Sequence, residues 1–137
     1  MKVMLDPGAT MPTRAHSTDA GLDIYSREDV VIKPGESFKF DTGIHMEIPA
    51  GYVGMLKSKS GLNVKHGITS EGVIDSGYTG SIVVKLYNLG KFPVYIQKGM
   101  KISQLVIMPI ITPDLEKVDS LEDTERGNGG FGSTGKF

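Results

Sequence analysis

The stretch SIVVKLYNLGKFPVYIQKGMKISQLVIMPII, residues 81–111, decides the fold class. It holds three runs rich in β-branched and aromatic residues, Ser81–Asn88, Val94–Gln97 and Lys101–Ile111, and a Lys98-Gly99 turn separates the last two. Short runs of this composition, bounded by glycine and proline, predict β-strands joined by tight turns.

The rest of the chain repeats this pattern. Five further strands are expected at Leu22–Ser26, Val30–Lys33, Ser37–Asp41, His45–Ile48 and Val53–Lys57. Pro34-Gly35 and Pro49-Ala50-Gly51 mark turns, and a short helix from Ser60-Gly61 through His66 is the only one expected. Many short strands without a long helical period predict an all-β sandwich, jelly roll or barrel.

Composition limits the function classes. The chain has 137 residues, which suits one domain, and its net charge of −1 gives no basic surplus for direct nucleic-acid binding. The absence of cysteine excludes disulfides and thiolate chemistry, and the three histidines form no metal-binding pattern. The start Met1–Pro7 lacks the apolar core of a signal peptide, and no stretch has membrane-spanning length, so a cytoplasmic protein without a membrane partner is expected.

Two segments combine polar groups that could perform chemistry. Gly72–Gly80 places the Asp75 carboxylate three residues before the Tyr78 phenol in a glycine-rich turn. These side chains either face a cleft together or serve as a turn aspartate and a core tyrosine. Lys57–Leu62 couples two lysines with two serines just before the expected helix. That segment fits an anion site at a helix N-terminus, or a serine N-cap beside solvated lysines.

Two more segments carry weaker signals. Asp19–Ile24 offers carboxylates where a strand begins, which is by default a turn. Lys98–Leu105 is interpreted as a turn leading into a buried strand, in which Gln104 is the polar residue that requires a hydrogen-bond partner.

The C-terminal stretch Arg126–Phe137 has, by itself, the composition of a flexible linker. Gly130–Lys136 also has the glycine and lysine spacing of a phosphate-binding P-loop. That loop requires Ser or Thr next and then a helix, whereas Phe137 stands there, so the P-loop interpretation is rejected.

Taken together and in order, five segments resemble the motifs of the trimeric dUTPase family. The resemblance spans nearly the whole chain, and its last motif, Arg-Gly-x-Gly-Gly-Phe-Gly-Ser-Thr-Gly, is highly specific. The matching segments are Asp19–Ile24, Ser58–Leu62, Gly72–Gly80, Lys98–Leu105 and Arg126–Gly135.

The resemblance implies a jelly-roll-like β core (residues 1–125) and a flexible arm (126–137) that closes over the active site of a neighbouring subunit. It implies a homotrimer that hydrolyses dUTP to dUMP and pyrophosphate with Mg²⁺, which removes dUTP and supplies dUMP for thymidylate synthesis. A viral chain would act in the host cytoplasm.

The resemblance also implies roles for individual residues. Asp75 resembles the base that activates the water attacking the α-phosphate, and Tyr78 resembles the residue that excludes a 2′-hydroxyl. Phe131 is expected to stack on uracil, and Asp23 to lie near the metal, acting through water or by ordering the site. The remaining substrate-binding residues fall in three sets: Gly72, Val73 and Ile74 for uracil; Lys59, Ser60, Gly61 and Gln104 for phosphate; and Arg126, Gly132, Ser133 and Thr134 for the β- and γ-phosphates.

The chain departs from the family pattern in three places. Lys59 stands where the family usually has arginine, preceded by Ser58 in place of proline, and a lysine lacks the bidentate fork. Lys57 is an alternative source of that phosphate contact. Thr79 replaces a common basic or polar residue, and the segment from His66 to Asp75 is shorter than in many relatives, which favours recognition of uracil by backbone groups.

Two other functions are compatible with parts of this pattern. The first is a dCTP deaminase of the same fold, which uses a glutamate in the third-motif region, and Glu71 lies near that position. The second is a regulatory protein in which nucleotide occupancy of the mobile arm exposes or hides a surface for a protein partner. No segment identifies such a partner.

Overall fold

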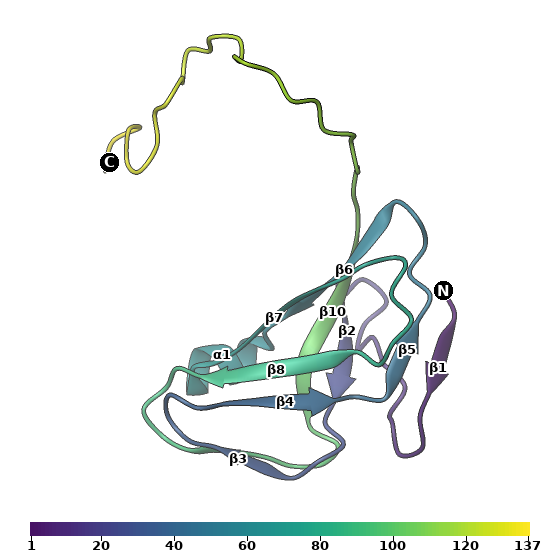
Figure 1. Ribbon diagram of the computed structural model, residues 1–137. Coiled ribbons are helices and arrows are strands. Elements are labelled where there is room, and N and C mark those ends of the chain that lie inside the picture. The colour runs from purple at the N-terminus through teal and green to yellow at the C-terminus, as the bar shows by residue number, and fades with distance from the viewer.

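The computed structural model describes residues 1–137 as a β-rich body with one helix and a long C-terminal extension (Figure 1). The elements in chain order are β1 (Val3–Leu5), β2 (Gly21–Tyr25), β3 (Val30–Ile32), β4 (Ser37–Asp41), β5 (Ile44–Met46), β6 (Tyr52–Lys57), α1 (Ser60–His66), β7 (Ile68–Ile74), β8 (Val83–Asn88), β9 (Val94–Ile96) and β10 (Lys101–Pro109).

The strands form one large sheet and two small ones. The large sheet has the order β2-β10-β6-β7-β8-β4, and the small sheets are β1-β5 and β3-β9. Every pairing between these strands is antiparallel. The predicted all-β, jelly-roll-like fold with one short helix is confirmed.

The core lies between the inner faces of these sheets. Strand β8 shows how the sequence builds it, because Val84 and Leu86 are buried while Val83 and Tyr87 point to solvent. On the neighbouring strand β4, the Phe38 and Phe40 rings meet edge to face with centroids 4.8 Å apart. The buried cluster contains 16 hydrophobic side chains, and it fixes the strands whose ends carry the motif residues.

The eight predicted strands are all present, with ends shifted by a few residues, and α1 covers the predicted helix. The prediction was incomplete for β7 and β1. Strand β7 alternates correctly, but its inward position Ser70 is a buried polar residue and Gly72 interrupts the pattern. Ser70 Oγ lies 2.8 Å from the buried Ser103 Oγ, so the two hydroxyl groups satisfy each other's hydrogen bonding in the core. From the sequence pattern alone, this polar segment suggests a loop.

Helix α1 ends at a glycine for two separate reasons. Gly67 has φ +69°, and a Cβ built there would lie 2.6 Å from the Gly90 nitrogen. The left-handed conformation and the close approach both require glycine. The helix has seven residues, and no helix of the chain is long and apolar enough to cross a membrane.

The chain leaves the sheets after β10. The Ile110 nitrogen still donates to the Gly51 carbonyl at 2.8 Å, and the stretch from 111 to 128 is exposed throughout. In Figure 1 this yellow-green extension arcs away from the β body and ends in a small loop.

Candidate active site

The motif residues fall into three groups in the structure. One group surrounds Lys59 at the start of α1, a second is the hairpin between β7 and β8, and the third is the loop at the end of the C-terminal extension.

The first group is organised by a buried carboxylate. Asp23 on β2 is 4% exposed, and its two oxygens lie 2.6 Å from Lys59 Nζ and 2.7 Å from Lys101 Nζ. Burial alone would raise the pKa of Asp23, but the hydrogen bonds from Lys101 and Lys59 outweigh burial and lower it. Asp23 therefore holds both ammonium groups at one edge of the sheet as an ionised carboxylate.

This pairing has a consequence for stability. We expect Asp23→Asn to lower the free energy of unfolding at pH 7 by about 1.5–3 kcal/mol, the range for hydrogen bonds to charged groups. Because the folded-state pKa is depressed, the wild-type contribution is present above the unfolded value and disappears as pH falls through the folded value. Urea unfolding at fixed protein concentration should show a gap between variant and wild type at pH 7 that shrinks below about pH 3.9. A gap independent of pH would contradict the ionic origin.

The start of α1 differs from one sequence alternative. Its N-cap is Lys59, which makes no capping hydrogen bond with its side chain, and Ser60 is already helical. Ser58 instead binds strand β7, where its Oγ accepts from the Ser70 nitrogen at 2.9 Å. The serine N-cap interpretation is therefore wrong, because Lys59 occupies the N-cap position and Ser58 bonds to β7. The first N–H groups of the helix remain without intrahelical acceptors.

Gln104 has a hydrogen-bond partner, as predicted for a polar residue in this strand. Its Nε2 donates to the Ser58 carbonyl at 2.9 Å, so it ties β10 to the segment that carries Lys59. The other end of the amide fills the space above Gly21, where a Cβ would lie 2.3 Å from Gln104 Oε1. Glycine at position 21 thus permits this placement of Gln104.

A basic hollow lies beside this group. It has a volume of about 330 Å³ and is lined by Lys59, Gly61, Leu62, Lys65, His66 and Lys101. The sequence alone does not indicate a site role for Lys101, although this residue lies in the fourth motif. Only the register of β10 against β2, with an irregularity between Lys101 and Ser103, brings its ammonium group to Asp23.

The second group is the β7–β8 hairpin. Asp75 directly follows β7, is exposed, and has no side-chain hydrogen bond or ion pair within the chain. The Tyr78 nitrogen donates to the Asp75 carbonyl at 3.0 Å, which forms the turn. The Tyr78 hydroxyl donates to the Ser81 carbonyl at 2.8 Å. Tyr78 is 45% exposed, so its ring stands at the hairpin surface and the core-tyrosine alternative is wrong.

The third group forms its own loop. Arg126 Nε donates to the Gly129 carbonyl at 2.8 Å, and the Gly129 nitrogen returns a bond to the Arg126 carbonyl. Arg126, Ser133 and Thr134 line one hollow, with Thr124, Glu125 and Gly129 as its other walls. Phe131 is fully exposed with φ +50°, a value rare for a residue with a side chain. The predicted phosphate-clamp residues are thus close together, away from the sheets.

The first two groups are not brought together within one chain. Gly54 on β6 pairs with Ile74, so Asp75 lies level with Val53, and Lys59 is six residues further along. At ~3.3 Å per residue this separation is roughly 20 Å. The hairpin and the lysine group therefore lie at opposite ends of β6.

The residues present can be compared with the requirements of Mg²⁺. The chain has no group of three His, Asp or Glu side chains placed to hold a metal, and both oxygens of Asp23 are taken by lysines. A magnesium cage built only from protein ligands does not fit this chain. A magnesium ion carried by substrate phosphates and water does fit, since Mg²⁺ commonly binds in that way.

Comparisons with known proteins identify the family of this chain. A family model described as dUTPase matches residues 8–135. The deoxyuridine 5′-triphosphate nucleotidohydrolase of Clostridium kluyveri is 50% identical over 130 residues, covering 93% of this chain and 91% of the relative. The Mus musculus protein of the same name is 47% identical over 135 residues, covering 98% and 83%.

Solved structures show the same similarity in three dimensions. The Staphylococcus bacteriophage 80alpha dUTPase with dUPNHPP has a TM-score of 0.88 and 38% identity and covers 98% of both chains. A variant dUTPase from S. aureus phage phi11, described as revealing the coordination of a structural Mg(II) ion, has a TM-score of 0.82 and 35% identity and covers 89% of this chain and 98% of that one. With a family match over nearly the whole sequence and relatives near half identical, this chain belongs to the dUTPase family.

Proposed function

We propose that this chain hydrolyses dUTP to dUMP and pyrophosphate. The observation that carries the proposal is the Asp75 carboxylate, which is exposed at the hairpin and has no side-chain partner of its own. Relatives of this chain are named for the hydrolysis of deoxyuridine 5′-triphosphate. Structures of the similar bacteriophage 80alpha dUTPase contain the analogue dUpNHpp.

In the proposed reaction, Asp75 accepts a proton from a water molecule. The water oxygen bonds to the α-phosphorus, the bond from that phosphorus to the bridging oxygen breaks, and pyrophosphate leaves. A positioned general base contributes about 10²–10⁴-fold to such a step. A free carboxylate is suited to this role because no ion pair has to break first.

The hairpin is proposed to select the nucleoside. The backbone of Gly72, Val73 and Ile74 would bind uracil, and the Tyr78 ring would pack under the deoxyribose. The Tyr78 hydroxyl is held by Ser81, and its ring lies so close to Gly80 that a Cβ there would meet the hydroxyl at 2.5 Å. The ring is thereby fixed, which a steric filter against a 2′-hydroxyl requires.

The lysine group is proposed to bind the triphosphate. Lys59 and Lys101 share the single charge of Asp23, so this cluster retains one positive charge, and the N–H groups at the start of α1 lie beside it. Ser60, Gly61 and Gln104 complete the surface. Arg126, Gly132, Ser133 and Thr134 of the arm would close on the β- and γ-phosphates, with Phe131 on the uracil.

The separation of these groups supports a multi-chain site. Since one chain holds Asp75 and Lys59 at opposite ends of β6, a triphosphate bound at Lys59 needs a hairpin from another copy. We therefore propose a homotrimer in which residues 126–137 form an arm that closes over the site of a neighbouring subunit.

Magnesium belongs to this proposal as an ion held by the substrate phosphates. When bound, it would neutralise phosphate charge and polarise the reacting phosphorus. Asp23 would act on it only indirectly, by ordering Lys59 and Lys101. The location that we propose for this reaction is the cytoplasm, or the host cytoplasm for a viral chain.

The direct test is pyrophosphate release from dUTP, dCTP, dTTP and UTP, each with magnesium and with excess chelator. Magnesium-dependent release from dUTP alone is the expected result. No release from any of the four, by a folded protein that still binds dUTP, would reject hydrolysis and favour a regulatory role.

Replacing Tyr78 should relax sugar selection. We expect Tyr78→Ala to raise the ratio of UTP to dUTP turnover roughly tenfold or more, a change within the range for steric pocket discrimination. Tyr78→Phe keeps the ring but loses the bond to the Ser81 carbonyl, so it should raise the ratio much less than Tyr78→Ala. Tyr95→Ala removes a similarly exposed tyrosine on β9 and serves as the control. An unchanged ratio in Tyr78→Ala would reject its role in sugar selection.

The two alternative functions have less support. Glu71, the candidate deaminase acid, forms an ion pair with Lys57 at 2.8 Å, several residues from the hairpin tip. Ammonia release from dCTP would favour deamination. A regulatory role is suggested by neighbouring phage dUTPases described as controlling the transfer of virulence genes, and it would be added to hydrolysis.

A further inference from the structure

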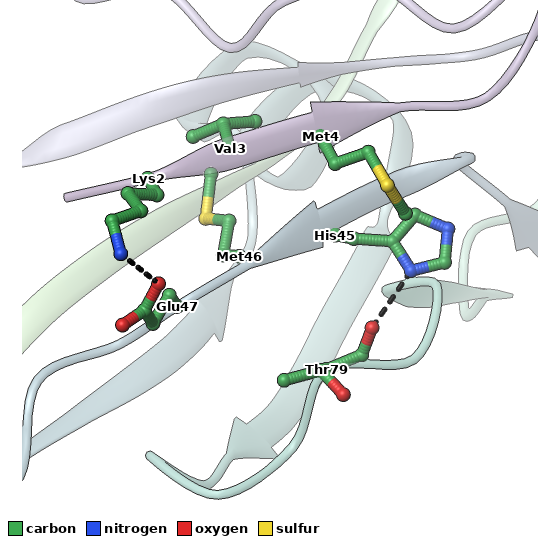
Figure 2. A pocket seen from close by; sticks show the side chains of 7 residues that line it. All are labelled: Lys2, Val3, Met4, His45, Met46, Glu47 and Thr79. Carbon is green, nitrogen blue, oxygen red and sulfur yellow. Dashed lines mark hydrogen bonds and ion pairs between the residues drawn. The ribbon is translucent and has the colours of Figure 1, made fainter.

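His45 links strand β5 to the hairpin that carries Asp75 and Tyr78. Its Nδ1 lies 2.8 Å from the carbonyl oxygen of Thr79, the residue after Tyr78. Figure 2 shows this contact, with the Met4 side chain of β1 pointing toward the imidazole from the opposite strand. His45 thus reaches the hairpin from a separate two-stranded sheet.

The partners of His45 define its charge state. A carbonyl oxygen only accepts hydrogen bonds, so Nδ1 must carry the proton. On the other side, Nε2 lies 3.2 Å from Asp6 Oδ1, and an ionised carboxylate also only accepts. Nε2 is buried without a well-directed hydrogen bond, so its contact with Asp6 is mainly ionic. Only the doubly protonated imidazolium gives both nitrogens a favourable neighbour.

The groups around His45 favour its protonated form. The Thr79 carbonyl and then Asp6 raise the pKa of His45, Asp41 adds to the effect, and burial opposes it. Asp6 is itself fixed, because its nitrogen donates to the Gly43 carbonyl at 2.8 Å. Arg27 lies near Asp41. His45 and Thr79 line a hollow of about 400 Å³, which the exposed Lys2–Glu47 ion pair also lines. This pair is internally neutral.

The hairpin has other attachments, but they lie at its base. Ser81 Oγ donates to Asp41, and the Thr42 hydroxyl donates to the Ile82 carbonyl at 2.6 Å. The tip is joined to the rest of the chain through His45 and Thr79. Among these contacts, only a histidine changes charge near neutral pH.

We propose that His45 is a positioning residue whose imidazolium clamps the Thr79 carbonyl and fixes the hairpin that presents Asp75 and Tyr78. For catalysis this rests on the proposed hydrolysis of dUTP. Because the folded-state pKa of His45 is raised, the charged clamp is complete below the ordinary value of about 6.5. As pH rises through the folded value the imidazole loses its charge and its attraction to Asp6, so the contact with Thr79 weakens to that of a neutral N–H donor.

The clamp can be observed without any substrate. In an NMR titration, the His45 ring signal, assigned by its absence in His45→Gln, should titrate with a midpoint above 6.5. Asp6→Asn should lower that midpoint. In His45→Ala, the backbone amides of residues 78–81 should exchange with solvent faster than in wild type. A midpoint at or below 6.5, with unchanged exchange, would overturn the proposal.

Kinetics then separate clamping from a general structural role. We expect His45→Ala to raise KM for dUTP about three- to tenfold, the equivalent of one hydrogen bond, with a smaller change in kcat. His45→Gln can donate an uncharged amide hydrogen to Thr79, so it should restore a low KM that no longer rises between pH 6.5 and 9. His16→Gln, which removes an exposed histidine that contacts Asp19, should keep the wild-type pH profile.

The outcomes distinguish this proposal from the proposed function. The protein could show a His45 titration midpoint above 6.5 and faster amide exchange of the hairpin in His45→Ala, yet hydrolyse no nucleotide. That result would retain the clamp and reject dUTP hydrolysis. Normal dUTP hydrolysis, with the same KM and pH profile in His45→Ala as in wild type, would reject the clamp and retain hydrolysis.

Discussion

Asp75→Asn should lower kcat for dUTP by roughly 10²–10⁴-fold, the usual contribution of a general base. The amide has nearly the same size but cannot accept the proton from the attacking water. Since the Asp75 side chain makes no hydrogen bond or ion pair within the chain, the substitution should leave the fold intact. Pyrophosphate release under saturating dUTP and magnesium measures the loss, and Kd for a non-hydrolysable analogue should change little.

Glu71→Gln is the matched control for this substitution. Glu71 is also an exposed carboxylate and lies on the strand that leads to Asp75, but it pairs with Lys57. It should retain dUTP turnover. If turnover instead fell in Glu71→Gln and survived in Asp75→Asn, the base would have to be reassigned and the deaminase alternative reopened.

Much of the fold was predictable because its signals are local. Val84 and Leu86 alternate with solvent-facing neighbours, and Pro34-Gly35 and Lys98-Gly99 punctuate the strands. Strand β7 was missed because its inward Ser70 is satisfied by Ser103, a residue 33 positions away. A polar residue in a core can be recognised only when its partner is known, and the partner is set by sheet register.

The same reason limited prediction of the candidate site. The motif residues could be chosen from the sequence, and Arg126, Ser133 and Thr134 do line one hollow. The Asp23–Lys101 contact depends on the pairing of β2 with β10, and the His45–Thr79 contact depends on how the β1–β5 sheet lies against the hairpin. Contacts of this kind join residues far apart in the chain, so no motif or residue spacing in the sequence predicts them.

Deleting Gly127–Phe137 should strongly reduce turnover while leaving the β core unchanged. The residues from 127 onward make hydrogen bonds only within the arm and residues 124–126, and none to the sheets. The 16-residue core cluster lies entirely within residues 24–105. Circular dichroism, thermal unfolding and size-exclusion chromatography should therefore match the wild-type protein. Pyrophosphate release should fall by about 100-fold or more, since phosphate contacts and a base-stacking group are lost together.

Two exposed phenylalanines allow the stacking part of that loss to be isolated. Phe131 and Phe137 are both fully exposed in the same arm, so their replacement by alanine removes equal surface at no cost to the core. Base–aromatic stacking is worth roughly 1–3 kcal/mol, which predicts that Phe131→Ala lowers kcat/KM for dUTP about 5- to 150-fold. Phe137→Ala lies outside the motif and should leave kcat/KM near the wild-type value. Equal effects of the two variants would mean that the arm contributes only general hydrophobic contact, and full activity of the deletion would show that the arm does not close over the site.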